Sequence, residues 1–323
     1  MIAGLVSTII PVYNRPQMLR EAVDSVLAQT WRPIEIIIVD DGSTDETAMV
    51  ADSLAAAQPD VVRIIHKQNG GPGLAREVGR LSARGEFIQY LDSDDLLLPV
   101  KFEVQVGGLR EHPECGVAYG WTRYRQADGA ENPLPWKGSG RKVDFMFPAF
   151  LLDRWWDTLT PLYRADVCEQ AGPWSDLRLE EDWEYDCRVA ALGTRLCYCE
   201  VYVAVVRDHA EHRLCKGMTT DPARQSERAR AHALVYSHAR RGGITAESPE
   251  MQHFARELFL LCRQCGAAGL KEESRRLFEL AREASGSKRG RGLDFVGYRV
   301  LAGFFGWVVP GKVACWSDRL REK

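Results

Sequence analysis

The first half of this 323-residue chain alternates short apolar runs with segments whose apolar residues recur at helical spacing. The apolar runs predict strands at residues 6–10, 34–39, 61–65 and 87–91. Most of these runs are apolar on both faces, which is typical of strands that are covered on both sides. The strand–helix alternation therefore predicts an α/β fold with a parallel sheet and helices on both faces.

Helices are expected between and after these strands. Apolar residues recur at helical spacing between positions 19 and 27 and predict the first helix. The sequence Ser43-Thr-Asp-Glu46 is a capping-box pattern and predicts a second helix that runs to about residue 57. Two further helices are expected at 73–82 and 99–112.

The second half of the chain becomes mainly helical after about residue 219. A helix that begins with acidic residues is expected at 179–192, followed by a strand at 196–206. Three more helices are expected at 224–241, 249–268 and 271–284.

Composition shifts divide the chain into three parts. The first part, 1–218, has a half at 1–115 that carries the alternating pattern and a second half at 116–218. A helical region follows at 219–285. Residues 286–323 are a basic, flexible linker and an amphipathic aromatic tail.

Composition and charge exclude several classes of protein. The net charge of −3 gives no general attraction to nucleic acid, so we expect no nucleic-acid partner. No uncharged stretch is long enough to span a bilayer. The apolar N-terminus lacks a basic leader, and nine scattered cysteines fit a reducing compartment. A cytoplasmic location is the expectation.

Polar residues follow the predicted strands at the points where the strands end. These are Pro11-Val-Tyr-Asn14, Asp40-Asp-Gly-Ser43 and Asp92-Ser-Asp-Asp95. Ligands bind beyond the carboxyl ends of the strands in such sheets. Asp92 and Asp94 can coordinate Mg²⁺ or Mn²⁺ through oxygen, and the cation would assist a departing phosphate. Alternatively, these aspartates turn the chain and cap the next helix.

The motifs at these strand ends resemble those of the family 2 glycosyltransferases, which are inverting enzymes with the GT-A fold. The resemblance rests on VSTIIPVYNRPQMLREAVDSVLAQTWRPIEIIIVDDGSTDET, GGPGLARE and GEFIQYLDSDDLLLP, in this order. Residues 161–193, PLYRADVCEQAGPWSDLRLEEDWEYDCRVAALG, resemble the acceptor half of the family. The resemblance implies a GT-A catalytic domain at 1–218, with a nucleotide-binding donor half at 1–115, an acceptor half at 116–218 and a C-terminal helical appendage.

The resemblance also implies roles for the donor side. Pro11, Tyr13 and Asp41 match nucleoside-binding positions, and Arg76 matches a donor contact. Asp92 matches a contact to the sugar or the ribose.

The metal ligand implied by the resemblance is Asp94, next to Ser93 in the donor site. His209 best matches a late metal- or diphosphate-contacting histidine, and His212 is close enough to leave that choice open. Mn²⁺ or Mg²⁺ is the expected cofactor.

The general base implied by the resemblance is Asp182. Inverting transfer needs one base for the proton of the acceptor hydroxyl. Asp182 lies at a predicted helix start, where the helix dipole keeps carboxylates ionised. Helix capping is the alternative role, and Asp186, one turn further on, is a reserve candidate.

These features predict an inverting, metal-dependent transferase in cell-surface polysaccharide or glycoconjugate biosynthesis. The expected donor is a UDP-sugar carrying a hexose or N-acetylhexosamine, and the acceptor is a hydroxyl of a glycan, a lipid-linked molecule or a protein. A catalytically silent nucleotide-sugar-binding or scaffold protein is the alternative. The tail at 286–323 predicts a peripheral contact with the cytoplasmic face of a membrane or packing against protein.

Overall fold

The computed structural model describes residues 1–209 and 221–321 and contains one eight-stranded mixed sheet. The order of the strands in the sheet is β3-β2-β1-β4-β7-β6-β8-β5. Their bounds are β1 Ile2–Val12, β2 Ile34–Asp40, β3 Val62–His66, β4 Gly85–Tyr90, β5 Leu96–Leu97, β6 Cys115–Arg125, β7 Leu162–Arg164 and β8 Arg195–Arg207. The chain divides into two compact units, and the whole sheet belongs to the first unit.

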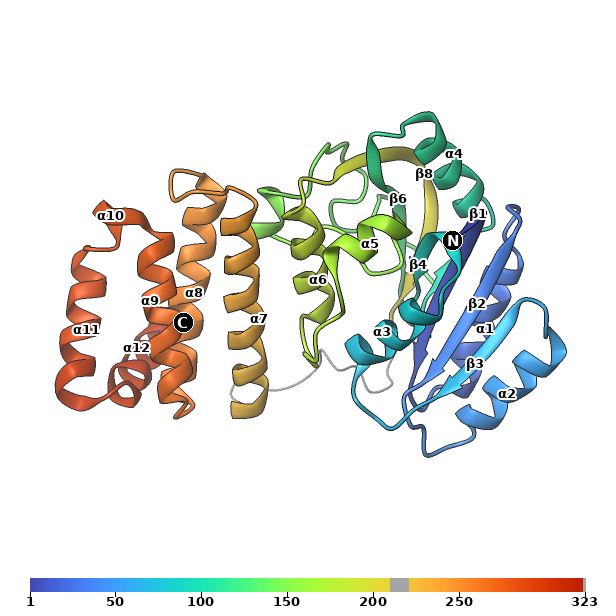
Figure 1. Cartoon of the computed structure of the whole chain (residues 1–323). Coiled ribbons are helices and arrows are strands. Elements are labelled where there is room, and N and C mark those ends of the chain that lie inside the picture. The colour runs from blue at the N-terminus through green and yellow to red at the C-terminus, as the bar shows by residue number, and fades with distance from the viewer. Residues whose placement is uncertain (210–220, 322–323) are drawn as a thin grey trace. The chain divides into compact units, whose positions relative to one another are not determined.

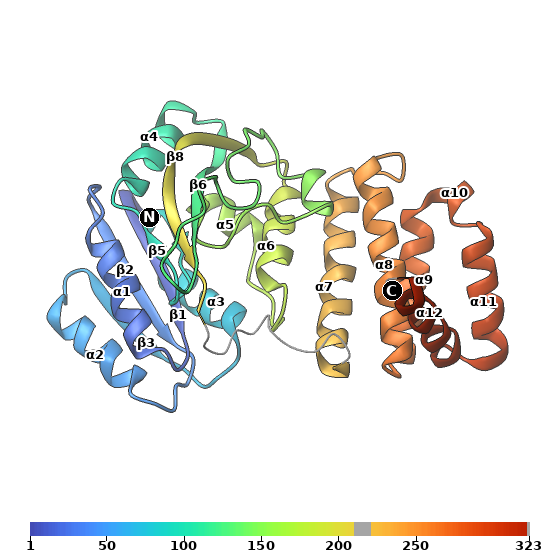
Figure 2. The same cartoon turned by 180° about the vertical axis from the view of Figure 1, so that it is seen from behind.

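The parallel half of the sheet confirms the predicted α/β class. β1 pairs in parallel with β2 and β4, and β2 pairs in parallel with β3. All seven residues of β2 are buried, as the doubly apolar run predicted. The helices of this half are α1 Pro16–Leu27, α2 Thr47–Ala57, α3 Pro72–Ser82 and α4 Lys101–Glu111. Figures 1 and 2 show α1 and α2 on one face of these strands and α3 on the other.

The other half of the sheet is mixed. β7 is antiparallel to both β4 and β6, β8 is parallel to β6, and β5 is antiparallel to β8. Two helices belong to this half of the chain, α5 Ala165–Ala171 and α6 Glu181–Ala190, together with a short 3-10 helix at Ala149–Leu151. β8 and α6 lie where the sequence predicted a strand and an acidic helix.

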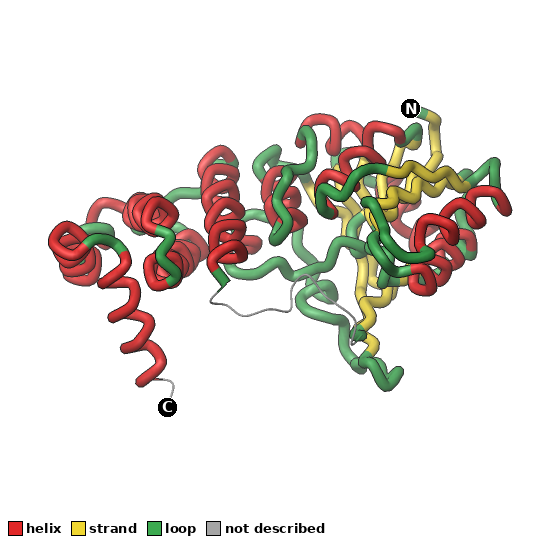
Figure 3. The backbone as a smooth tube through the Cα atoms, turned by 90° about the horizontal axis from the view of Figure 1, so that it is seen from below, coloured by secondary structure: helices red, strands yellow, loops and turns green. Residues whose placement is uncertain are grey.

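The second unit contains helices and loops and no strand among its described residues (Figure 3). Its helices are α7 Pro222–Arg241, α8 Pro249–Ala267, α9 Lys271–Ala284, α10 Gly286–Arg289, α11 Leu293–Phe305 and α12 Val308–Arg321. Asp221 and Ser248 cap α7 and α8 by accepting hydrogen bonds from backbone N–H groups. In the range the structure covers, none of the helices combines the length and the apolar character needed to cross a bilayer.

One short helix was not expected from the sequence. α10 forms at the start of the region 286–323, where a basic, flexible linker was predicted. The Arg282 Nε donates to the Gly290 carbonyl at 3.2 Å, and the Arg289 guanidinium donates to Gln252 at 2.7 Å. These two contacts order a segment whose glycine-rich composition predicts a flexible loop.

The three-part division of the chain stays a prediction. The expected boundary at 218 lies outside the described residues. The second compact unit also includes Phe147–Asp153 and Asp186–Ala191, which lie within the expected first part.

Candidate active site

The carboxyl ends of β1, β2 and β4 meet at one edge of the sheet. The register aligns Val12 with Asp40 and Ile9 with Tyr90, so the segments that follow these strands begin side by side. Strand-end polar residues are therefore brought together, as the sequence predicted.

The segments after β1 and β2 are joined by Asn14. This residue has a φ of 52°, a conformation that asparagine tolerates better than most residues. Its side-chain oxygen accepts from the backbone N–H of Thr44 at 2.8 Å, and its own N–H donates to Ser43 Oγ at 3.0 Å. Pro11 is buried within β1, whereas the ring of Tyr13 is exposed beyond the strand. A ring in this position is available to stack on a base.

Asp41 holds the loop that leads into α3. Its carboxylate accepts hydrogen bonds from the N–H groups of Gly70 and Gly71, at 2.9 and 2.8 Å, and pairs with Lys67. Gly71 has a φ of 96°, which favours glycine. Asp41 is almost completely buried, so these contacts give it a structural role in addition to the nucleoside contact predicted for it.

Arg76 links the segment after β4 to the start of α6. One end of its guanidinium donates to Asp92 at 2.6 Å, and the other donates to Glu181 at 2.8 Å. The guanidinium also lies 4.8 Å from the ring centroid of Trp174, a cation–π distance. Only 3% of the Arg76 side chain is exposed. The predicted donor contact is thus fixed in place between two carboxylates.

Burial and neighbouring charge set the protonation of this cluster. Burial and the adjacent Asp182 raise the pKa of Glu181 to about 7, against the opposing effect of Arg76. Burial also raises the pKa of Asp92, although Arg76 counteracts it. For Arg76, burial lowers the pKa, but Asp92 and Glu181 outweigh it and raise the pKa above its ordinary value. The arginine therefore stays charged.

Asp94 lies between two basic side chains. His209 Nε2 is 2.9 Å from Asp94 Oδ2, and Arg15 forms an ion pair with the same oxygen. Burial raises the pKa of Asp94, but His209 and Arg15 outweigh it and bring the pKa down to about 2. Ser93 is buried beside it. The structure thus brings together Asp94 and His209, the two predicted metal ligands, whereas His212 lies outside the described residues.

Arg207 attaches the end of β8 to the Asp-Ser-Asp motif. Its Nε donates to the Asp94 carbonyl at 2.6 Å, and its backbone N–H donates to Asp95 at 3.0 Å. Arg207 also forms an ion pair with Glu21 of α1. No specific role was assigned from the sequence to Arg15, Arg207 or Asp95. Two of them had a positional signal, because Arg15 adjoins the Pro11–Asn14 segment and Asp95 ends the polar segment after β4.

Asp182 is held at the first turn of α6. Its Oδ2 accepts from Arg154 at 2.7 Å and from Thr158 at 3.2 Å, while Oδ1 accepts from the backbone N–H of Trp183 at 2.7 Å. Burial raises the pKa of Asp182, but Arg154 and Arg76 outweigh it and hold the pKa below its ordinary value. The carboxylate is ionised and 29% exposed. The reserve candidate, Asp186, is almost fully buried and belongs to the second compact unit.

The residues around Asp94 fit a divalent cation, although they do not form a complete ligand shell. Over the described ranges, no group of three or more His, Cys, Asp or Glu side chains is arranged to hold a metal ion. Asp94 and His209 nevertheless supply an ionised carboxylate and an imidazole, donors that suit Mn²⁺. The buried Nδ1 of His209 has no hydrogen-bond partner in the described part of the chain. A cation held by two protein ligands retains positions for diphosphate oxygens.

Comparisons with known proteins indicate the family of the first half of the chain. Residues 7–164 match the model of glycosyl transferase family 2. An uncharacterized Mycobacterium bovis protein, Mb1547, is 31% identical over 252 residues, which cover 73% of this chain and 70% of that protein. Residues 7–164 therefore form a glycosyl transferase family 2 region of this chain. The glycosyltransferase GlyG of Streptococcus pneumoniae, another relative, is 36% identical over 129 residues, covering 40% of this chain and 42% of GlyG.

Other relatives, which are uncharacterized glycosyltransferases, share only a segment with this chain. An uncharacterized glycosyltransferase of Rickettsia felis is 45% identical over 107 residues, which are 33% of this chain and 17% of that protein. The Rickettsia typhi relative RT0329 is also 45% identical over 107 residues, covering 32% of its own length. The chain therefore matches less than a third of the length of these relatives.

Solved structures support the same fold. Staphylococcus aureus TarS 1–349 in complex with UDP-GlcNAc superposes with a TM-score of 0.63 at 17% identity, over 87% of this chain and 88% of that one. The mannosyltransferase PcManGT from Pyrobaculum calidifontis, in complex with GDP-Man and Mn²⁺, has a TM-score of 0.54 at 18% identity, over 98% and 87% of the chains. These likenesses confirm the GT-A type architecture with its C-terminal helices.

Proposed function

We propose that this protein transfers a sugar from a nucleoside diphosphate sugar to a hydroxyl acceptor with inversion at the anomeric carbon. The expected donor is a UDP-sugar that carries a hexose or N-acetylhexosamine. The acceptor is a hydroxyl of a glycan, a lipid-linked molecule or a protein, in cell-surface polysaccharide or glycoconjugate biosynthesis in the cytoplasm. TarS with UDP-GlcNAc and PcManGT with GDP-Man support a nucleotide-sugar donor.

The observation that carries the proposal is the double contact of Arg76. Asp92 follows a donor-side strand and Glu181 adjoins Asp182 on α6, yet the same buried guanidinium binds both carboxylates. The expected base is thereby held beside the donor motif. Transfer needs this arrangement because the acceptor oxygen must approach the anomeric carbon on the face opposite the departing diphosphate.

Asp182 is the group that we assign to take the proton from the acceptor hydroxyl. Arg154 and the N–H of Trp183 keep its carboxylate ionised and fix its orientation. A low pKa makes it a weak base, but the hydroxyl becomes strongly acidic only as it bonds to carbon, so a weak base suffices. Arg154 and Thr158 both donate to Oδ2 of Asp182. The proton therefore goes to Oδ1 or to a lone pair that these donors leave free.

Arg76 and the Asp-Ser-Asp motif are the donor-side groups. Arg76 binds Asp92 and Glu181 and so positions the Asp-Ser-Asp motif for the expected donor. Asp94 and His209 are the residues that would hold Mn²⁺ or Mg²⁺. That cation, when bound, would act as a Lewis acid that stabilises charge on the leaving diphosphate. Tyr13 and Asp41 are assigned to the nucleoside.

The second candidate is a nucleotide-sugar-binding or scaffold protein without activity. The ion pair between Arg15 and Asp94 favours it, because the arginine occupies an oxygen that a metal would need. Release of UDP from UDP-sugars with Mn²⁺, with and without candidate acceptors, separates the two. The enzyme is supported if the unmodified chain turns over and Asp182→Ala and Asp94→Ala each abolish turnover. Full turnover by both variants contradicts the assignment. Binding without turnover, for every donor and acceptor tried, supports the second candidate.

A further inference from the structure

Helix α11 in the second unit is apolar on two opposite sides. Phe295, Tyr298 and Ala302 face the core of the unit and are buried. The Phe295 and Phe259 ring centroids are 4.7 Å apart, and the Tyr298 ring stacks on Phe278 at 5.8 Å. One side of the helix thus accounts for its packing within the unit.

The opposite side of α11 is exposed. Leu293, Val296, Val300 and Phe304 recur at intervals of three and four residues, so they form one stripe along the helix. Their exposed fractions are 91, 48, 51 and 80%. An apolar stripe of this length is uncommon on the surface of a soluble domain and marks a surface that contacts another apolar phase.

Helix α12 continues this exposed apolar character. Val309, Val313 and Trp316 are exposed along it at intervals of four and three residues. Tryptophan is favoured at membrane–water interfaces, where its ring is amphipathic. The two helices have 13 and 14 residues, and neither crosses a bilayer.

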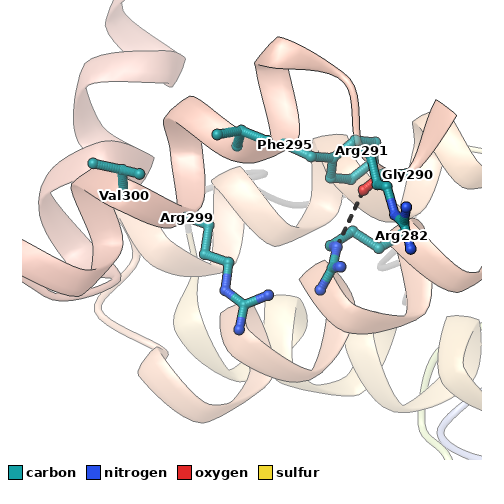
Figure 4. Close-up of a pocket in the computed structure, with 7 residues that line it drawn as sticks. Arg282, Gly290, Arg291, Phe295, Arg299 and Val300 are labelled. Carbon is teal, nitrogen blue, oxygen red and sulfur yellow. Dashed lines mark hydrogen bonds between the residues drawn. The ribbon is translucent and has the colours of Figure 1, made fainter. Parts of the chain in front are cut away.

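Arginines lie next to the exposed stripe. A pocket of about 270 Å³ has Arg282, Arg291 and Arg299 on its lining together with Val296 and Val300 of the stripe (Figure 4). The guanidinium groups of Arg291 and Arg299 have no ion-pair or hydrogen-bond partner within the described part of the chain. Arg282 is already engaged, through Gly290 and Glu279.

The charge around the stripe is the reverse of that of the whole chain. Residues 286–316 contain five lysines and arginines and one aspartate, whereas the chain carries a net charge of −3. An exposed apolar stripe flanked by unpaired cations complements a surface that has anionic groups on the outside and an apolar layer beneath them. A second copy of this basic segment would bring like charges together.

We infer that α11 and α12 dock this protein onto a bilayer that contains anionic lipid. Leu293, Val296, Val300 and Phe304 enter the boundary between headgroups and acyl chains. Arg291 and Arg299 bind lipid phosphates beside the stripe. The inference is independent of the proposed sugar transfer, since it uses neither a donor-site nor an acceptor-site residue.

Co-sedimentation of the full chain with vesicles tests the inference. The vesicles are pure phosphatidylcholine, or phosphatidylcholine with phosphatidylglycerol at a ratio of about 7:3. We expect binding to the anionic vesicles and at least about tenfold weaker binding to the neutral ones. Failure of the unmodified chain to bind anionic vesicles overturns the inference.

Two variants and two matched controls identify the surface. We expect each of two double variants to weaken binding to anionic vesicles by about tenfold or more. One combines Val300→Gln with Phe304→Gln, and the other combines Arg291→Glu with Arg299→Glu. All four side chains are exposed, so folding should be retained, which circular dichroism verifies. Leu81→Gln and Arg20→Glu are the controls, because both residues are exposed, belong to the first unit and are distant in sequence from α11. Unchanged binding by either double variant overturns the inference, as does a dimer in solution that the Val300→Gln, Phe304→Gln variant dissociates.

Discussion

Arg76 on α3 donates a 2.8 Å hydrogen bond to Glu181 at the start of α6, across 105 positions of the sequence. The same guanidinium binds Asp92 at 2.6 Å. A single buried cation therefore balances two carboxylates and joins the segment after β4 to the helix that carries Asp182. This arrangement makes Arg76 important for stability as well as for any donor contact.

We predict that Arg76→Met destabilises the first unit strongly. Removing one partner of a buried ionic group leaves charges without compensation, at a cost of about 3–5 kcal/mol. At roughly 2–4 °C per kcal/mol for a unit of this size, the melting temperature should fall by about 6 °C or more. Differential scanning calorimetry measures the change. Arg20→Met on the exposed side of α1 is the control and should change the melting temperature little.

A second substitution tests whether lost charge compensation causes this loss. Adding Glu181→Gln to Arg76→Met removes one of the two carboxylates left unpaired, so part of the stability should return. A double variant that is less stable than Arg76→Met alone would contradict the electrostatic account and point to lost packing against Trp174.

Asp182→Asn should reduce the turnover number by about 10²–10⁴-fold, because the amide cannot take the proton of the acceptor hydroxyl. The shape of the site should persist, since the amide retains an oxygen for Arg154 and Thr158. We therefore expect the affinity for the donor, measured by calorimetry with UDP, to change less than about threefold. Asp60→Asn, at an exposed turn, should retain full activity. More than a tenth of normal turnover in Asp182→Asn would remove Asp182 from the role of base.

The sequence predicted the location of the site well. It gave little information on the contacts that hold the site together. The end of each parallel strand is visible as a change from apolar to polar residues, so Asp41, Asp92 and Asp94 were expected at one edge. The pairs that fix these groups join distant segments, as Arg15 with Asp94 does across 79 residues. Single-sequence periodicity carries no information on such pairs.

The strands that were missed have a similar explanation. β5 and β7 contain two and three residues, too few to show any periodicity. β6 is longer, but its second part carries Arg123 and Arg125 and loses the apolar signal. α10 was missed because glycine and basic residues predict a loop, whereas contacts from Arg282 and Arg289 order it.

Asp94→Asn should weaken Mn²⁺ binding by about tenfold or more, because the amide is a poorer ligand for a hard cation than a carboxylate. His209→Ala should weaken it as well, through the loss of an imidazole donor. Electron paramagnetic resonance of free Mn²⁺, with UDP present, gives the affinities. His112→Ala is the control, since that imidazole is exposed and lies before β6, away from the carboxyl ends of the strands. Equal Mn²⁺ affinity in the unmodified chain and Asp94→Asn would show that Asp94 is not the ligand.

Glu181→Gln should flatten the dependence of stability on pH between pH 5 and pH 8. The fold raises the pKa of Glu181 from about 4.5 to about 7, chiefly by burial. A raised carboxyl pKa contributes stability that is complete below the unfolded value and is lost as pH rises through the folded value. The unmodified chain should therefore lose unfolding free energy over this window, and Glu181→Gln should lose less. Melting temperatures at several pH values measure both slopes. Glu169→Gln, an exposed glutamate of α5, should keep the slope of the unmodified chain. If Glu181→Gln also keeps that slope, Glu181 is ionised throughout the window, and the ion pair with Arg76 outweighs the cost of burial.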